Sequence, residues 1–429
     1  MQLKKLDNAL LLAVLFAALI VRLPFLFIVP MVEAPDEYAH FWVTKFLSEN
    51  LAAPDAAQVA AGGPSAVYGS LPPFAYLPHA LFARLIPFVD ISFAERVGSI
   101  FGGLITVFAS CKISELLFSR IRELRLALPL CVALHPQLVF VNAYCNSDST
   151  ACALSSLLIW LSLVVVLRGP SLRYSALAGV LSACIALSKF SALAVVPVAF
   201  FSIAAGCWIY KRNVGQIVLN LGLALLSAAP VCLPWFARNA AVFNGDYLGS
   251  ITMRETWART FHRSIEPVSL SSVLKQKVWW QQLFCSFWAV FGYQKHYLPA
   301  PFYLSYLLAI LVSIAGTLTQ ISQAIRKKSI AFGDEDLKHL VAWLGLWLSV
   351  ALSSAGLLYA AVQNLGGPQG RYLFPSEVAF MSVILMGLFS VHRKWGKWLV
   401  FAFVGLNLVT LIFSMVMLYS MFGVRIKPY

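Results

Sequence analysis

The sequence predicts an all-α polytopic membrane protein with about 11 transmembrane helices. Of its 429 residues, 60% are hydrophobic and only 12% are charged, and the mean hydropathy is +0.79. Soluble domains carry about 25% charged residues, so this composition excludes an ordinary soluble protein. Apolar runs of about 20 residues recur along the chain, with short basic loops between them. We therefore expect residues 1–429 to form a single transmembrane domain.

The spans can be placed in order from these apolar runs. The first is expected at residues 9–29, and a long outward loop follows at 31–92. A second outward loop, at 237–297, should hold an interfacial helix, because residues 278–293 are rich in Trp and Phe but form only a short run. The other spans are expected at 93–118, 126–141, 149–167, 214–235, 299–325, 340–362, 372–391 and 398–422, with a hairpin of two more within 174–210.

The net charge of +14 follows the membrane topology and does not indicate nucleic-acid binding. Its basic residues cluster in every loop that this order places on the cytoplasmic side, as the positive-inside rule requires. The clusters begin with Lys4 and Lys5 and include residues 120–125, 168–173, 211–212, 326–328 and 393–397. The N-terminus is then cytoplasmic and the C-terminus lies outside. Since the inward loops are short, any functional site should lie on the outward side.

Two further features exclude other kinds of structure. No small-residue cleavage site follows the first apolar run, so we expect an uncleaved helix there and not a signal peptide. The eight cysteines lie mostly within apolar runs and lack C-x-x-C spacing, which indicates core residues and neither a disulfide framework nor a zinc site.

An acidic stretch, residues 33–41, directly follows the first span. Pro35 suits the first position of a helix, and Asp36 and Glu37 would then lie in its first turn. Asp36 and His40 share one face, and aromatic residues cover another, which predicts an interfacial helix with its acidic end at a cavity. Acids that only cap a helix are the alternative. Two carboxylates beside a bilayer cost free energy, however, which favours a functional role over simple capping.

Two outward cations are the next candidates. Lys189 stands alone at the bend of an apolar hairpin, so it needs an anionic partner or a path to water, and simple snorkelling is the alternative. Arg371 closes the glycine-rich stretch 366–372 at the outward end of a span. Its guanidinium could hold a phosphate through two parallel hydrogen bonds, or it could only anchor the span at the interface.

Weaker candidates complete the outward set. Arg238 could contact a ligand or simply end a helix. Asp148 could line the same cavity as Asp36 or cap the fourth span. His40 and His79 fit satisfied polar residues better than ligands of a metal site. A carboxylate base and cations around a phosphate are the parts needed to transfer a group from a lipid-linked phosphate.

Four stretches carry a family resemblance: residues 35–41, 72–76, 187–190 and 369–375. By the order of these stretches and the side of the membrane on which they lie, the chain resembles the GT-C fold glycosyltransferases. Within that group it is most similar to a bacterial family of multi-span membrane proteins with a Pro-Asp-Glu-x-x-His-Phe motif in the first outward loop. Such enzymes use polyprenyl-phosphate or polyprenyl-diphosphate sugars at the outer face of the membrane.

The resemblance implies a role for each candidate. Asp36 is expected to be the general base, and Glu37 to orient it or to contact the acceptor. The residues expected to meet the donor phosphate are Lys189, Arg371 and Arg238. Those expected in the substrate site are His40, Asp148 and Tyr372. No cofactor is expected, and a divalent metal is possible but not implied, because the outward loops lack a D-x-D motif.

The expected function is therefore that of an integral membrane glycosyltransferase in the bacterial cytoplasmic membrane. It would move a sugar from a polyprenyl-phosphate donor to a cell-envelope glycan or glycolipid. A single base favours inversion, since retention needs a second carboxylate, which Asp148 could supply. A transporter or flippase of a lipid-linked saccharide is the alternative, but it would need charges deep within the spans. A non-catalytic subunit of an envelope assembly is a further alternative.

Overall fold

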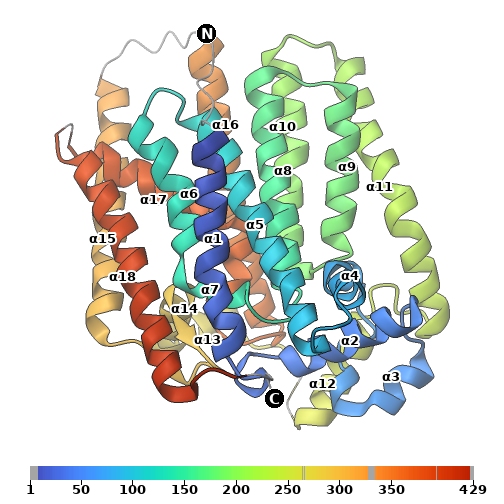
Figure 1. Ribbon diagram of the computed structural model, residues 1–429. Helices are drawn as coiled ribbons and strands as arrows, with labels where there is room; N and C mark the ends of the chain where they lie inside the picture. Colours follow the sequence, from blue (N-terminus) through green and yellow to red (C-terminus); the bar gives the residue numbers. More distant parts are fainter. Residues whose placement is uncertain (1–7, 263, 265, 327–333, 393, 426–429) are drawn as a thin grey trace.

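The computed structural model describes residues 8–262, 264, 266–326, 334–392 and 394–425. Long helices lie side by side, and short helices gather at one end of the bundle (Figure 1). Within the described ranges, nine helical segments are long and apolar enough to cross a membrane. They are α1 (Asn8–Ile28), α5 (Ile91–Leu117), α8 (Asp148–Arg168), η4 with α10 (Phe190–Ile209), α11 (Val214–Val242), α15 (Ala300–Arg326), α16 (Asp334–Val362), η5 with α17 (Gly370–Ser390) and α18 (Gly396–Phe422). The predicted all-α polytopic membrane fold is confirmed.

Two of the expected spans are shorter than predicted. The helix α9 (Leu172–Ala186) has 15 residues and packs against α8 and α11. The span expected at 126–141 is divided into α6 (Arg122–Leu134) and α7 (Pro136–Val141). Between them His135 is extended, because the residue before a proline is disfavoured in the helical conformation. The total number of spans therefore stays a prediction.

The short helices mark the side that the sequence assigns to the outside (Figure 1). They are α2 (Glu37–Asn50), α3 (Ala56–Gly62), α4 (Leu77–Leu85), α12 (Ser250–Phe261), α13 (Leu270–Lys275) and α14 (Lys277–Trp288). The backbone N–H of Arg425 donates to the carbonyl of Phe27 at 2.9 Å, so the end of α18 lies beside the end of α1. The two ends share a side, as the topology requires. Of the basic residues named above, Lys4, Lys5, Lys327, Lys328 and Arg393 lie outside the described residues.

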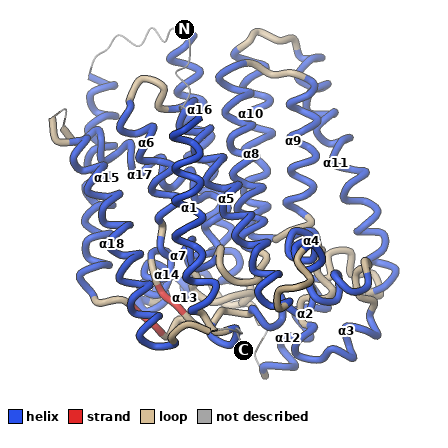
Figure 2. The backbone as a smooth tube through the Cα atoms, viewed as in Figure 1, coloured by secondary structure: helices blue, strands red, loops and turns tan. Residues whose placement is uncertain are grey.

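The second outward loop differs in detail from the expected interfacial helix. Helix α14 exposes Val278 and Trp280, yet Trp288 at its end is only 1% exposed and stacks on Tyr306, with ring centroids 4.0 Å apart. A small antiparallel hairpin follows, formed by β1 (Val290–Phe291) and β2 (His296–Tyr297) and drawn in red in Figure 2. The aromatic run is thus half surface and half core, and the sequence did not indicate the hairpin.

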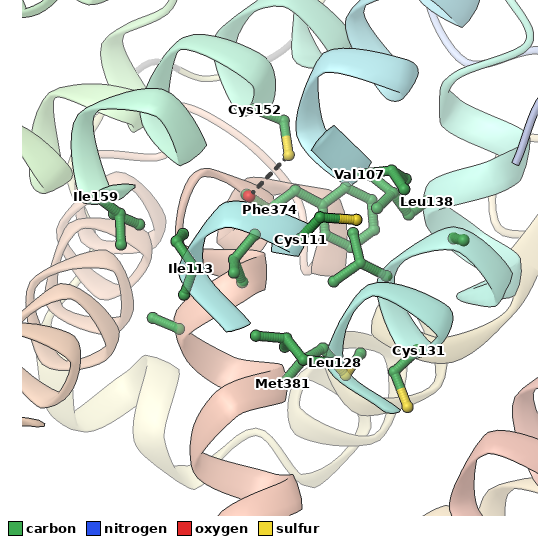
Figure 3. Close-up of a cluster of buried hydrophobic side chains, with 14 of the residues drawn as sticks. Val107, Cys111, Ile113, Leu128, Cys131, Leu138, Cys152, Ile159, Phe374 and Met381 are labelled. Carbon is green, nitrogen blue, oxygen red and sulfur yellow. Dashed lines mark hydrogen bonds between the residues drawn. The ribbon is translucent and has the colours of Figure 1, made fainter. Parts of the chain in front are cut away.

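The main core lies between α5, α6, α8 and α17, and Figure 3 shows part of it. All eight cysteines are free, and seven of them are buried, which confirms their expected role as core residues. Cys152 on α8 donates a hydrogen bond from Sγ to the carbonyl of Phe374 at 3.1 Å (Figure 3). This contact ties α8 to the 3-10 helix η5 (Gly370–Ser376), which carries Arg371.

Candidate active site

Asp36 has an unusual backbone conformation. It precedes α2 as the N-cap residue, with φ of 62°, and its side chain makes no capping hydrogen bond. The helix begins at Glu37, so Asp36 lies outside the first turn in which the sequence placed it. Its backbone N–H donates to the hydroxyl of Tyr293 at 3.1 Å. A left-handed φ is uncommon outside glycine, although Asp tolerates it. In this conformation the carboxylate makes no hydrogen bond to the N–H groups at the start of the helix.

Arg371 holds that carboxylate. Its Nη2 donates to Oδ2 of Asp36 at 2.7 Å, and its Nη1 donates to the hydroxyl of Tyr144 at 2.9 Å. Arg371 is 5% exposed, whereas the Asp36 side chain is 31% exposed. Gly370 allows this placement, since a Cβ atom there would lie 2.2 Å from the backbone of Phe287. A guanidinium with two such contacts has a fixed orientation.

A second ion pair adjoins the first. Lys189 Nζ donates to Oδ1 of Asp148 at 2.6 Å, and Oδ2 of Asp148 lies 3.9 Å from Nη1 of Arg371. Burial lowers the pKa of the Lys189 ammonium, and the Asp148 carboxylate partly offsets that effect. The ring of Tyr372 lies 5.3 Å from Lys189 Nζ and 5.8 Å from the Arg371 guanidinium. Two acids and two bases from four distant segments thus form one charge network.

Glu37 has a separate set of contacts. It is fully buried and forms a bidentate ion pair with Arg96, at 2.7 Å from Nε and 2.6 Å from Nη2. Its Oε1 also accepts from the backbone N–H of Cys145 at 2.8 Å. Arg96 in turn donates from Nη1 to the carbonyls of Leu26 and Val29. These bonds fix the start of α2 against α1 and α5, and the expected contact of Glu37 with an acceptor stays a prediction.

His40 lies one turn into α2, on its buried face. Its Nδ1 is 2.8 Å from the Tyr76 hydroxyl, and its ring stacks on Tyr68 at a centroid distance of 4.7 Å. Burial lowers the pKa of His40 well below its ordinary value, as do the charges of Lys189 and Arg371. His40 is therefore a neutral, hydrogen-bonded side chain, and its expected contact with substrate stays a prediction.

His79 is also buried, and its Nδ1 donates to the carbonyl of Glu95 at 2.8 Å, whereas its Nε2 has no hydrogen-bond partner in the described structure. Burial lowers its pKa from 6.5 to about 4. Across the described ranges, no three His, Cys, Asp or Glu side chains gather closely enough to hold a metal ion.

Arg238 lies apart from the charge network. Its guanidinium covers the ring of Trp235 at 5.1 Å and donates to the carbonyls of Ala53 and Pro54. Arg238 lines an open, mainly apolar groove of about 480 Å³ between α4 and α11. Leu187, two residues before Lys189, lines the same groove.

The structure adds three contacts that the sequence analysis missed. Arg96 had a readable signal, since it is a charge within an apolar span and needs a partner. Tyr144 and Tyr293 had none, because nothing in the sequence around them indicates that they meet Arg371 and Asp36.

A solved structure has a similar architecture. ArnT from Cupriavidus metallidurans, bound to undecaprenyl phosphate, aligns with 99% of this chain over 77% of its own, at a TM-score of 0.54 and 14% identity. ArnT is a GT-C glycosyltransferase. The chain has the GT-C fold. The apo state of ArnT aligns with 89% of this chain over 77% of its own, at a TM-score of 0.43 and 14% identity. No protein-family model and no curated protein sequence matches the chain. The GT-C likeness seen in the four motifs is thus confirmed at the level of the fold.

Proposed function

We propose that the protein is an integral membrane glycosyltransferase that moves a sugar from a polyprenyl-phosphate donor to an envelope glycan or glycolipid. The observation that carries the proposal is the Asp36–Arg371 pair, a partly exposed carboxylate on a buried guanidinium at the outward end of a GT-C fold. The undecaprenyl phosphate bound to ArnT supports a lipid phosphate as the ligand. The reaction would take place at the outer face of the bacterial cytoplasmic membrane.

In this proposal Asp36 is the general base. Among the described residues, only Oδ2 of its carboxylate accepts a hydrogen bond, so Oδ1 is available to an acceptor hydroxyl. Asp36 takes the proton as the acceptor oxygen bonds to the anomeric carbon. The bond from that carbon to the phosphate oxygen breaks, and its electron pair leaves with the polyprenyl phosphate. Arg371 and Lys189 stabilise the charge that develops on the phosphate.

We propose an inverting displacement, and the position of the second acid supports it. Asp148 is 3% exposed, and one of its oxygens lies 2.6 Å from Lys189. A retaining enzyme would need this carboxylate to attack the anomeric carbon. We propose instead that Asp148 holds Lys189 in place for the donor phosphate.

The groove at Arg238 would suit the apolar chain of the donor. Pro73, Leu77 and Leu187 form part of its wall, and Leu187 leads directly to Lys189. A prenyl chain in the groove would bring its phosphate to the end occupied by Lys189, and Arg238 would contact the lipid along the way. The sequence analysis assigned Arg238 to the donor phosphate, whereas here it would contact the lipid chain, so that assignment stays a prediction.

One feature favours the alternative of a flippase. His135 and Glu377 form a fully buried pair in the bundle, with Nδ1 and Oε1 2.7 Å apart. Ionisable residues buried within spans often mark a transport pathway. Here the rings of Phe287, Trp288 and Phe374 surround His135, so the pair lies in an aromatic core.

Donor turnover separates the two functions. The purified protein in nanodiscs is incubated with a panel of polyprenyl-phosphate sugars, and free polyprenyl phosphate is measured with and without an envelope glycolipid fraction. A transferase releases the lipid phosphate and gains rate with the acceptor. A flippase in sealed vesicles moves the intact donor across the bilayer and releases none, and that result would overturn the proposal.

A further inference from the structure

A small cavity of about 20 Å³ adjoins the Asp36–Arg371 pair. Its walls include Gln137 from α7, Tyr144, Gln294 from the β1–β2 hairpin, and Arg371 itself. About 10–15 Å³ is enough for one water molecule, so the cavity accommodates a single hydroxyl-sized group. No carboxylate is among its lining residues.

Each of the two glutamines is held by a hydrogen bond at one end of its side-chain amide. Gln137 is 6% exposed, and its Oε1 accepts from the backbone N–H of Val290 at 2.7 Å, which leaves its amino group free. Gln294 donates from Nε2 to the carbonyl of Pro368 at 2.9 Å, which leaves its Oε1 free. The Nε of Arg371 is buried and has no hydrogen-bond partner in the described structure. The lining thus has both donors and an acceptor to spare.

We infer that this cavity is the inner end of the site for the donor sugar and that it selects a neutral, hydroxyl-bearing ring. The inference rests on the proposed function. A hydroxyl both donates and accepts, so it suits the free amino group of Gln137 and the free Oε1 of Gln294. An amino sugar would bring its ammonium beside the Arg371 guanidinium, which repels it, and none of the residues that line the cavity carries a carboxylate. A uronic acid would compete with Asp36 for Arg371 and so disturb the base.

The β1–β2 hairpin forms the more exposed wall of this site. Gln294 has φ of 60° and follows Tyr293, which is 47% exposed. The opposite wall is rigid by comparison, since Gln137 and Arg371 are both nearly buried. A sugar ring is larger than the cavity, so it would enter by displacing the hairpin tip.

The test uses the full-length protein in nanodiscs and three donors on one polyprenyl phosphate: a neutral hexose, a hexosamine with a free amine, and a uronic acid. We expect kcat/KM for the hexose to exceed the other two by about tenfold or more. Preferred turnover of the amine or the acid would overturn the inference and leave the glycosyltransferase proposal standing. Release from none of the donors, with or without an acceptor, would overturn both.

A substitution then tests which residue recognises the donor sugar. Gln294→Gly removes the side chain at a φ that glycine accepts, and Gln281→Ala on the exposed face of α14 is the control. Gln294→Gly should lower kcat/KM for the hexose donor by about tenfold, while inhibition by sugar-free polyprenyl phosphate changes by less than about twofold. Equal losses in turnover and in inhibition would instead assign Gln294 to the lipid phosphate or to folding, and would overturn its role in sugar binding.

Discussion

Arg371 donates a 2.7 Å hydrogen bond to Asp36, although 335 positions separate the two residues in the chain. Asp36 precedes the first outward helix, whereas Arg371 opens the last span but one. The proposed base and its cation therefore meet only when distant parts of the chain pack together. Asp148 and Lys189 come from the middle of the chain and complete the network.

Arg371→Lys should lower donor turnover by about 100-fold, because an ammonium cannot hold both Asp36 and Tyr144 in the present geometry. The measurement is release of polyprenyl phosphate by the purified variant, with a monodisperse elution profile as the check on folding. Arg259→Lys, on the exposed helix α12, is the matched control and should behave like the wild type. Wild-type turnover of Arg371→Lys would show that the contacts of the guanidinium with Asp36 and Tyr144 are dispensable.

Glu37→Gln should destabilise the fold by about 3–5 kcal/mol, since it leaves the buried charge of Arg96 without a partner. Thermal unfolding in detergent measures the change. The control is Glu49→Gln on the same helix, whose exposed pair with Lys45 contributes about 0.5 kcal/mol or less. Replacing both partners, Glu37→Leu with Arg96→Met, should restore much of the lost stability. A variant with normal stability but a raised KM for acceptor would favour the acceptor contact that the sequence predicts.

The pH dependence of stability should reflect His79. Its pKa is about 4 in the folded protein against 6.5 for an ordinary histidine. Between these values the unfolded chain binds a proton that the folded chain does not, so the stabilisation is complete above pH 6.5 and declines as the pH falls. At about pH 5 the loss is about 2 kcal/mol. His79→Gln should therefore show a smaller drop in Tm on acidification than the wild type. An unchanged drop in Tm would mean that groups other than His79 cause the loss of stability on acidification.

Chelation should leave turnover nearly unchanged. In the proposed mechanism Arg371 and Lys189 meet the phosphate charge, and the two acids beside them already have cationic partners. We expect the rate with EDTA to stay within about twofold of the untreated rate, because no step requires a divalent ion. The comparison uses the same protein before and after addition of Mg²⁺ or Mn²⁺. Loss of turnover with EDTA and recovery with either ion would contradict this assignment.

The sequence predicts nine of the spans in the described ranges from apolar length, whereas the short helix α9 and the division into α6 and α7 depend on more than length. It also singles out the members of the charge network, since Asp36 and Lys189 are costly beside lipid unless they are paired. It does not show which acid meets which base. That pairing depends on packing between distant segments, and so does the position of Arg238 away from the network. Pro136 could have indicated the break between α6 and α7.

Two local features had no signal in the pattern of residues. The Pro35-Asp36-Glu37 stretch fits an ordinary helix start, so nothing in it indicated the left-handed backbone of Asp36 or its contact with Tyr293. Because of this backbone conformation, the side chains of Asp36 and Glu37 point to different partners. Adjacent carboxylates that look equivalent in sequence therefore have different partners, Arg371 for one and Arg96 for the other.

The rate of donor turnover by Asp36→Asn tests the central claim most directly. Asparagine accepts the same left-handed backbone and can still accept a hydrogen bond from Arg371, but it cannot take a proton. We predict that the variant folds normally and loses about 10²–10⁴-fold in polyprenyl phosphate release, while Glu49→Gln keeps the wild-type rate. Full activity of Asp36→Asn would contradict the assignment of Asp36 as the base.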